Sequence, residues 1–158
     1  SQNMRTCGFG NTTVFICIPP PQIRNPELEI ELFAYGGTIP WPEDKWSSWY
    51  NYWIDCHENK RYYRYLKNED GQFVGEISYR YDTEIQHEIA NVIIYSKYRK
   101  KGYGSEALTL LCSVAKNNGI SVLYDDIAID NPSITLFLKH GFVEESRTGE
   151  KIIIKKEL

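Results

Sequence analysis

The chain has 158 residues, of which 42% are hydrophobic and 25% charged, an ordinary globular balance that suits one domain with a sizeable core. A formal net charge of −3 and a pI of about 5.7 argue against a nucleic-acid-binding protein, whose phosphate contacts need a basic surface. The sequence lacks both a long uninterrupted apolar stretch and a signal-peptide pattern, so no membrane partner is expected.

The cysteines and histidines give no sign of a disulfide framework or a metal site. The cysteines are scattered without a C-x-x-C pair: Cys7, Cys17, Cys56 and Cys112. This usage predicts reduced thiols and a cytoplasmic location. The histidines lack metal-ligand spacing, so no metal is expected. Residues 1–3 resemble vector-derived residues before Met4, and we expect a single domain over residues 4–158.

The N-terminal part carries two predicted strands and a predicted aromatic helix. Residues 12–18 are β-branched and apolar, which indicates a strand. Residues 28–35 alternate acidic and apolar side chains until Gly36-Gly37, the pattern of a half-buried strand. Pro42 then opens a helix whose aromatic side chains recur at helical spacing: Trp46, Trp49, Tyr50 and Trp53. Such stripes pack in cores, and they also line concave binding sites.

The middle of the chain has the pattern of an antiparallel meander. Residues 61–67 and 73–81 flank Asp70-Gly71, a good hairpin turn signal. Residues 88–95 are rich in Ile and Val and predict the next strand.

Helices and strands alternate in the remaining third. An apolar stripe predicts a helix over residues 103–117, and residues 122–129 predict a strand. Asn131-Pro132 gives an N-cap and a helix-opening proline for a short helix over residues 133–140. A last hairpin is expected around Thr148-Gly149, with strands at residues 142–147 and 151–156. The element order predicts an α+β or mixed-sheet domain.

The turn between the strand over residues 88–95 and the following helix has the features of an anion cradle. Its sequence is Arg99-Lys100-Lys101-Gly102-Tyr103-Gly104. The first turn of a helix presents free N–H groups and the positive end of the dipole, and glycines let a ligand approach the backbone closely. The alternative is a solvated basic turn in which the glycines serve only the backbone geometry.

A dinucleotide fingerprint competes for the same residues. Gly102, Gly104 and Ala107 fit G-x-G-x-x-A, and Asp125 or Asp126 lies near the distance at which an acid would hold a ribose. A dinucleotide-binding fold needs several further βα units, whereas this chain ends in a hairpin and begins with a meander. The pattern therefore disfavours an NAD-binding domain.

Three motifs in order resemble the GNAT superfamily of acetyl-CoA-dependent N-acetyltransferases. The family signature R/Q-x-x-G-x-G/A is matched by Arg99, Gly102 and Gly104. The acid-led apolar strand that precedes it is matched from Glu88 to Ile94. The later motif, an Asn before a short helix that ends in Gly-Phe, is matched from Asn131 to Phe142, although Asp130 could fill the Asn role. The resemblance covers residues 88–142.

This resemblance implies a mostly antiparallel central sheet flanked by helices, the GNAT-like acyl-CoA N-acyltransferase fold. It also implies that two strands splay apart around the pantetheine of acetyl-CoA, the expected cosubstrate, with coenzyme A as product. The residues expected to contact the coenzyme are Ile93, Ile94, Tyr95, Arg99, Lys100, Lys101, Gly102, Tyr103, Gly104, Ser105, Asn131, Ser133 and Phe137.

One departure from the family affects the chemistry. A tyrosine often follows the leucine of the last helix and protonates the departing thiolate, whereas here Leu136 is followed by Phe137. A simple thiol has a pKa near 8.5, so the thiolate leaves fairly well unaided, and the loss of the tyrosine could slow the reaction without abolishing activity. Tyr124 on the neighbouring strand is a possible substitute, although packing is its more ordinary role.

The acceptor is expected to be a primary amine on a small molecule or peptide, which must lose a proton before it attacks. Glu88 is the candidate general base, acting through a water; an exposed strand-start carboxylate without a catalytic role is the alternative. Weaker candidates are His87, Glu76 and Asp126, and the predicted acceptor pocket consists of Trp46, Trp49, Tyr50 and Glu76.

Phe137 also favours a second hypothesis, a non-catalytic module that binds coenzyme A for regulation. Either protein would act as a monomer or homodimer.

Overall fold

The computed structural model describes residues 14–17, 31–32, 37–38, 46–57 and 60–158. Residues 12, 13 and 18 of the strand expected over residues 12–18, most of the strand expected over residues 28–35, and the expected helix start at Pro42 lie outside these ranges.

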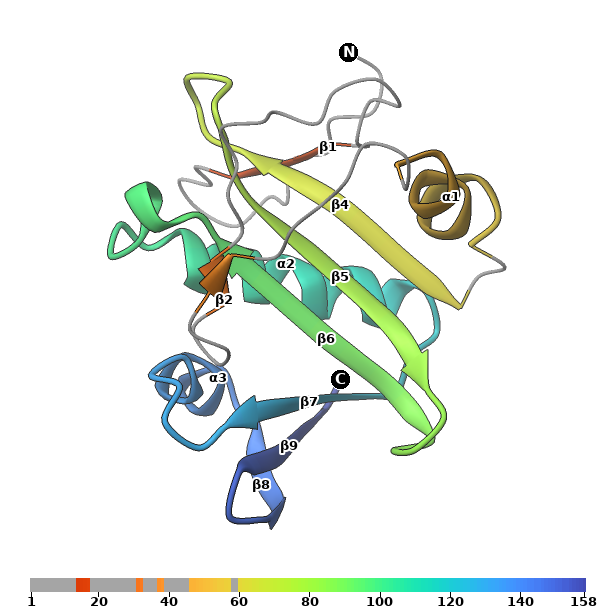
Figure 1. Cartoon of the computed structure of the whole chain (residues 1–158), viewed down its shortest axis with the longest axis vertical. Coiled ribbons are helices and arrows are strands. Elements are labelled where there is room, and N and C mark those ends of the chain that lie inside the picture. Colours follow the sequence, from red (N-terminus) through yellow and green to blue (C-terminus); the bar gives the residue numbers. More distant parts are fainter. Residues whose placement is uncertain (1–13, 18–30, 33–36, 39–45, 58–59) are drawn as a thin grey trace.

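A seven-stranded sheet organises the described part of the chain (Figure 1). Its order is β1-β4-β5-β6-β7-β9-β8, and every neighbouring pair is antiparallel except β6–β7, which is parallel. The strands are β1 (Phe15–Cys17), β4 (Arg61–Lys67), β5 (Phe73–Asp82), β6 (His87–Ile94), β7 (Val122–Ala128), β8 (Val143–Arg147) and β9 (Lys151–Glu157). The predicted mixed, mostly antiparallel sheet is therefore confirmed.

A separate two-stranded sheet pairs β2 (Glu31–Leu32) with β3 (Gly37–Thr38). Gly37 thus begins a second short strand, which the sequence pattern did not predict.

Helices cover both faces of the large sheet. Helix α2 (Tyr103–Asn117) lies across β5 and β6, and its apolar stripe is buried against them, as the sequence predicted (Figure 1). The side chains that alternate toward α2 include Ile77 and Tyr79 on β5 and Ala90 on β6, all at most 3% exposed. On the opposite face, the ring of Trp49 meets Tyr63 of β4 edge-on at 4.7 Å between centroids.

The aromatic helix differs from its prediction in form. It runs as an α-helix, α1, over Trp46–Tyr50 and continues as a π-helix over Asn51–Asp55. The Arg61 guanidinium donates hydrogen bonds to the carbonyl oxygens of Tyr52 at 2.9 Å and Cys56 at 2.6 Å, which helps to hold the widened last turn. The sequence pattern missed this change because Arg61 acts from the following strand.

The C-terminal third follows the prediction closely. Helix α3 (Ile134–Lys139) lies on the α2 side, where Phe137 and Phe142 meet edge-on in the core. The Oδ1 atom of Asn131 accepts a hydrogen bond from the Ser133 N–H at 2.9 Å. Asn131 therefore stabilises the turn that leads into α3, while Ser133 is the residue immediately before the helix. Phe142 is a core residue rather than the first residue of β8.

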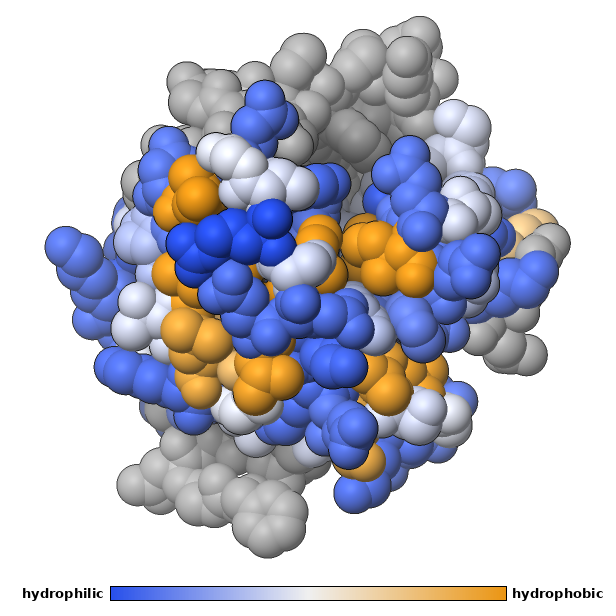
Figure 2. Space-filling view, turned by 90° about the horizontal axis from the view of Figure 1, so that it is seen from below, coloured by the Kyte–Doolittle hydropathy of each residue, from blue (hydrophilic) through white to orange (hydrophobic). Residues whose placement is uncertain are grey.

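Apolar and hydrophilic side chains are interspersed on the surface. On the face shown in Figure 2, apolar residues form several patches separated by hydrophilic ones. Scattered exposed apolar side chains of this kind are normal for a folded domain. Among the described residues, the helices are too short or too polar to cross a bilayer.

Candidate active site

Strands β6 and β7 separate soon after they meet. They pair only at Glu88 with Leu123 and at Ile89 with Tyr124, although β6 continues to Ile94 and β7 to Ala128. Residues 90–94 therefore have their sheet partners on β5 alone. The opening leaves one edge of β6 facing a gap, as the resemblance implied.

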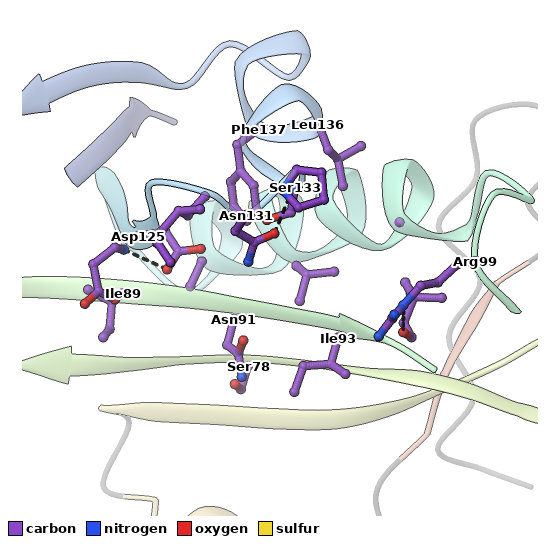
Figure 3. A pocket seen from close by; sticks show the side chains of 18 of the residues that line it. Ser78, Ile89, Asn91, Ile93, Arg99, Asp125, Asn131, Ser133, Leu136 and Phe137 are labelled. Carbon is purple, nitrogen blue, oxygen red and sulfur yellow. Dashed lines mark hydrogen bonds between the residues drawn. The ribbon is translucent and has the colours of Figure 1, made fainter. Parts of the chain in front are cut away.

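A cavity of about 980 Å³ occupies this gap, within the usual range for small-molecule and cofactor sites. It extends from the basic turn to the point where β6 and β7 meet, and Figure 3 shows side chains from β6, β7 and α3 around it. Its described lining residues are Trp53, Ser78, Arg80, residues 89–94, Tyr98, Arg99, Lys100, Gly102, Gly104, Ser105, residues 125–128, Asn131, Pro132, Ser133, Leu136, Phe137, Glu150 and Lys151.

The basic turn forms one end of the cavity. Lys100 and Gly102 adopt positive φ angles of 61° and 89°, and α2 starts at the next residue, Tyr103. This reversal directs the N-terminal end of α2 toward the cavity, where its unbonded N–H groups and dipole favour an anion. The Arg99 Nε atom donates a hydrogen bond to the Ile94 carbonyl oxygen at 2.9 Å, so Arg99 also fixes the turn against the end of β6.

Gly104 keeps this end of the cavity open. A Cβ atom at Gly104 would lie 3.2 Å from Cδ2 of Leu136 and 3.8 Å from Cγ1 of Ile94. Both neighbours line the cavity, so any larger side chain would compete with a ligand for space. The residues of the turn therefore fit a diphosphate-sized anion.

A hydroxyl–imidazole pair ties the turn to the end of α3. The Ser105 Oγ and His140 Nε2 atoms are 2.7 Å apart, and the Thr109 Oγ1 and His140 Nδ1 atoms 3.4 Å apart. Thr109 donates its hydroxyl proton to the Ser105 carbonyl oxygen at 3.0 Å, so its oxygen is left to accept from Nδ1–H. The neutral ring then carries its lone pair on Nε2, and Ser105 donates to it.

Burial lowers the pKa of His140, and the positive charge of Lys156 lowers it further. Both effects favour the neutral imidazole that this arrangement needs. The sequence pattern carried no signal of this contact, because His140 at the end of a predicted helix meets a residue 35 positions earlier.

Most of the residues predicted to contact the coenzyme line the cavity. These are Ile93, Ile94, Arg99, Lys100, Gly102, Gly104, Ser105, Asn131, Ser133 and Phe137. Three others do not: Tyr95 is buried, Lys101 is exposed and Tyr103 packs against the core. Residue contact with a coenzyme stays a prediction for the whole set.

The predicted acceptor pocket is not gathered at this cavity. Among the described residues, Trp53 lines it, whereas Trp49, Tyr50 and the buried Glu76 do not. The side chain of Trp46 lies outside the described part. The π-helix moves the C-terminal end of the aromatic stripe out of simple helical register, which sequence spacing did not reveal.

The candidate bases occupy different places. Glu88 does not line the cavity; it lies in the last residue pairs before β6 and β7 separate. His87 stacks on the Tyr124 ring at 4.4 Å between centroids. Asp126 does line the cavity and forms an ion pair with Lys151 at 3.2 Å.

Two charged residues line the cavity that were not predicted to do so, Asp125 and Arg80. Asp125 was considered only for a ribose. Its neighbours Leu123 and Ile127 are buried, so strict alternation along this strand would have placed a carboxyl group on the core-facing side. Arg80 gave no such signal, because arginines are common on strands at the surface.

Comparisons with known proteins agree with this architecture. Residues 26–142 match the acetyltransferase (GNAT) family. YwnH of Bacillus subtilis (strain 168), a protein named provisionally as a phosphinothricin acetyltransferase, is 34% identical over 134 residues, which cover 75% of this chain and 79% of YwnH.

Two solved structures share the fold. An N-acetyltransferase from Staphylococcus aureus Mu50 aligns with a TM-score of 0.74 at 17% identity, over 92% of this chain and 99% of its own. The protein yncA from Salmonella typhimurium, named provisionally as an acetyltransferase and solved with acetyl-CoA, aligns with a TM-score of 0.62 at 19% identity, over 75% of each chain. The chain therefore belongs to the acetyltransferase (GNAT) family, which confirms the resemblance seen in the sequence.

Gly104→Val should weaken coenzyme A binding at least tenfold, because the branched side chain would enter the space beside Leu136 and Ile94. Titration calorimetry with coenzyme A measures this, with a thermal melt to verify folding. Gly149→Val is the control, since a Cβ at Gly149 meets nothing within 4 Å and Gly149 does not line the cavity. Equal affinity of a folded Gly104→Val protein would contradict the anion cradle.

Coenzyme A binding should strengthen as the pH falls toward the pKa of His140, which burial and Lys156 hold below its ordinary value. The lowered pKa keeps His140 neutral in the free protein, so the Ser105 proton is directed to the ring rather than to a phosphate. A protonated ring would instead donate to Ser105 and free its hydroxyl for the anion. Binding should therefore raise the His140 pKa and take up a proton.

Calorimetry in buffers of different ionisation enthalpy measures that proton uptake. Ser105→Ala should remove it, whereas Ser146→Ala, which changes an exposed hydroxyl on β8 outside the described cavity lining, should retain it. Equal uptake by wild type and Ser105→Ala would exclude the linkage.

Proposed function

We propose that this protein transfers the acetyl group of acetyl-CoA to the primary amine of a small molecule. The observation that carries the proposal is the continuous cavity from the anion-binding turn to the vertex where β6 and β7 separate. Acetyl-CoA has the matching order of parts, a diphosphate followed by an extended pantetheine and a thioester. The presence of acetyl-CoA in the related yncA structure supports the same cosubstrate here.

In this arrangement the diphosphate binds at the N-terminal end of α2, and the pantetheine follows the edge of β6. Main-chain groups of residues 90–94 that lack a partner on β7 can then bond to the pantetheine amides and the thioester oxygen. Donors aimed at that oxygen stabilise the negative charge that develops when the amine attacks. The chemistry occurs near the vertex, at the level of Ile89 to Asn91.

The acceptor must attack as a neutral amine. At pH 7 a lysine-like amine with a pKa near 10.4 is neutral in roughly one molecule in two thousand, so a base assists. Glu88 is our candidate, and since its side chain does not border the cavity, it acts through an intervening water.

Charges of both signs border the vertex end of the cavity, which suits an acceptor with an ammonium and an anionic group. Arg80 enters from β5, and Asp126 and Glu150 lie on the other side. Phosphinothricin, named for the relative YwnH, has this charge pattern, and it is the first acceptor to test. Amino acids, polyamines, aminoglycosides and peptide N-termini complete the panel.

The test is acetyl-CoA turnover with this panel, read as free thiol, beside calorimetric binding of acetyl-CoA. The proposal requires both binding and acceptor-dependent thiol release. Binding without release for every amine would instead support the non-catalytic module, which Phe137 in place of a tyrosine favours.

Glu88→Gln should lower kcat about 100-fold, the lower end of the range for general acid–base catalysis, and flatten the rise of rate with pH. The affinity for acetyl-CoA should hold. Glu157→Gln, an exposed carboxylate on β9, serves as the matched control. A wild-type pH profile in Glu88→Gln would remove Glu88 from the mechanism.

A further inference from the structure

The departing thiolate needs a proton, and two aromatic residues near the cavity do not supply it. Phe137 has no hydroxyl and packs against Phe142 at 5.1 Å between ring centroids. The Tyr124 hydroxyl donates to Glu145 Oε1 at 3.4 Å, and Tyr124 is not part of the described cavity lining. The predicted role of Tyr124 as a substitute acid is therefore not supported by its position.

Asp125 lies where a proton donor is needed. It directly follows Tyr124, whose pairing with Ile89 is the last contact in the β6–β7 ladder, so Asp125 is the first β7 residue at the vertex of the gap. Its buried neighbours Leu123 and Ile127 place it by alternation on the sheet face that carries α2 and α3. Figure 3 shows Asp125 on the same side of β6 as Asn131 and Phe137, and all three line the cavity.

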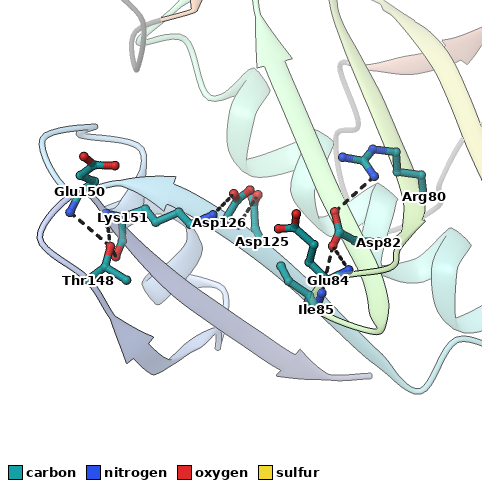
Figure 4. A network of polar contacts seen from close by, with 9 residues as sticks. All are labelled: Arg80, Asp82, Glu84, Ile85, Asp125, Asp126, Thr148, Glu150 and Lys151. Atoms are coloured by element: carbon teal, nitrogen blue, oxygen red, sulfur yellow. Dashed lines mark hydrogen bonds and ion pairs between the residues drawn. The ribbon is translucent and has the colours of Figure 1, made fainter.

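The two adjacent aspartates are held differently (Figure 4). Asp126 is paired with Lys151 at 3.2 Å, whereas Asp125 has no ion pair with a described residue. The Oδ1 atom of Asp125 accepts a hydrogen bond from the Asp126 main-chain N–H at 2.8 Å, which leaves its second oxygen available to carry a proton.

Burial raises the pKa of the Asp125 carboxyl well above its usual range. The negative charge of Asp126 raises it further, and the hydrogen bond from the Asp126 N–H opposes both effects. Asp125 is half-buried and borders the cavity, so a ligand in the cavity would desolvate it more. The environment therefore favours the protonated acid.

The charged groups around the cavity do not reverse this preference. Helices α2 and α3 contribute no charged side chain to the described cavity lining. Their lining residues are Gly104, Ser105, Leu136 and Phe137, which are uncharged. On β6, Glu88 shares the sheet face of Asp125 and is also acidic. The remaining charged lining residues come from four places. They are Arg80 on β5, Arg99 and Lys100 in the basic turn, Asp126 on β7, and Lys151 at the start of β9 with Glu150 just before it.

We propose that Asp125 is the catalytic acid that protonates the coenzyme A thiolate, a role that rests on the acetyl transfer proposed above. The amine nitrogen attacks the thioester carbon, and the carbonyl electrons move to oxygen. When the intermediate collapses, the carbon–sulfur bond breaks and its electron pair takes the proton from Asp125. The nitrogen loses a proton to Glu88 and water, and that proton returns to Asp125 after release of the products.

Asp125→Asn tests this role, because the amide keeps the shape and an oxygen for the Asp126 N–H but does not donate an acidic proton. The probes are acetyl-CoA and the amine of the panel that gives the highest turnover. We expect kcat to fall roughly 10- to 100-fold, near the low end for general acid catalysis because a thiolate leaves readily. The KM for acetyl-CoA should change little, since the proton moves only in the transition state.

The pH profile separates this role from a structural one. An acid must be protonated, so the wild-type rate should fall as the pH rises through the raised pKa of Asp125, and Asp125→Asn should lose this falling limb. Phe137→Tyr in the Asp125→Asn background should restore part of kcat. Its falling limb should appear at higher pH, toward the ordinary tyrosine pKa near 10.

Asp70→Asn is the matched control, because Asp70 lies in the β4–β5 turn away from the cavity. An Asp125→Asn protein with the wild-type kcat and falling limb would overturn the assignment while leaving the acetyl transfer intact. Loss of the rising limb instead would make Asp125 a base and equally overturn it. Absence of turnover in the wild type, with acetyl-CoA bound, would overturn acetyl transfer and this role together.

Discussion

The site depends on how soon the parallel pairing of β6 and β7 ends. Two residue pairs fix the vertex, and beyond them main-chain groups that would complete a ladder face a cavity instead. Buried main-chain groups need partners, so such an edge favours a ligand that supplies amides and carbonyls in an extended line. In the proposed reaction the thioester would reach this vertex, where Ile89 and Asp125 line the cavity.

Local features were predicted well because local physics determines them. The strand over Arg61–Lys67 and the helix over Tyr103–Asn117 have the predicted bounds, since apolar periodicity and flanking turn residues specify both. The basic turn was also found, because two glycines between a strand and a helix constrain the backbone. The family resemblance added what these patterns lacked. It implied that the strand before the basic turn, β6, and the strand after α2, β7, separate from each other.

The remaining features depend on contacts between distant segments. The Ser105–His140 pair joins α2 to the residue that follows α3, and the π-helix before β4 is held by Arg61 from the strand that follows. Where β6–β7 pairing stops is likewise a tertiary property, so the sequence did not show which carboxyl groups border the gap. Glu88 was prominent because it begins a strand motif, whereas Asp125 lay within an apolar strand and was weighed only as a ribose ligand.

Helix α3 connects the two ends of the cavity. Its central Phe137 borders the vertex region, and His140 at its end contacts Ser105 of the anion-binding turn. Residues in or next to one short helix thus border the cavity near β7 and contact the first turn of α2.

The protonation state of Asp125 also bears on how the acceptor becomes reactive. An ionised carboxylate at the vertex would stabilise the ammonium form of the acceptor and raise its pKa, which opposes the deprotonation that attack requires. A neutral acid has no such effect, and it can donate to sulfur when the carbon–sulfur bond breaks. Burial and the nearby Asp126 charge raise the pKa of Asp125 and favour its protonated form, so in the proposed mechanism Asp125 serves as the acid while Glu88 accepts the amine proton.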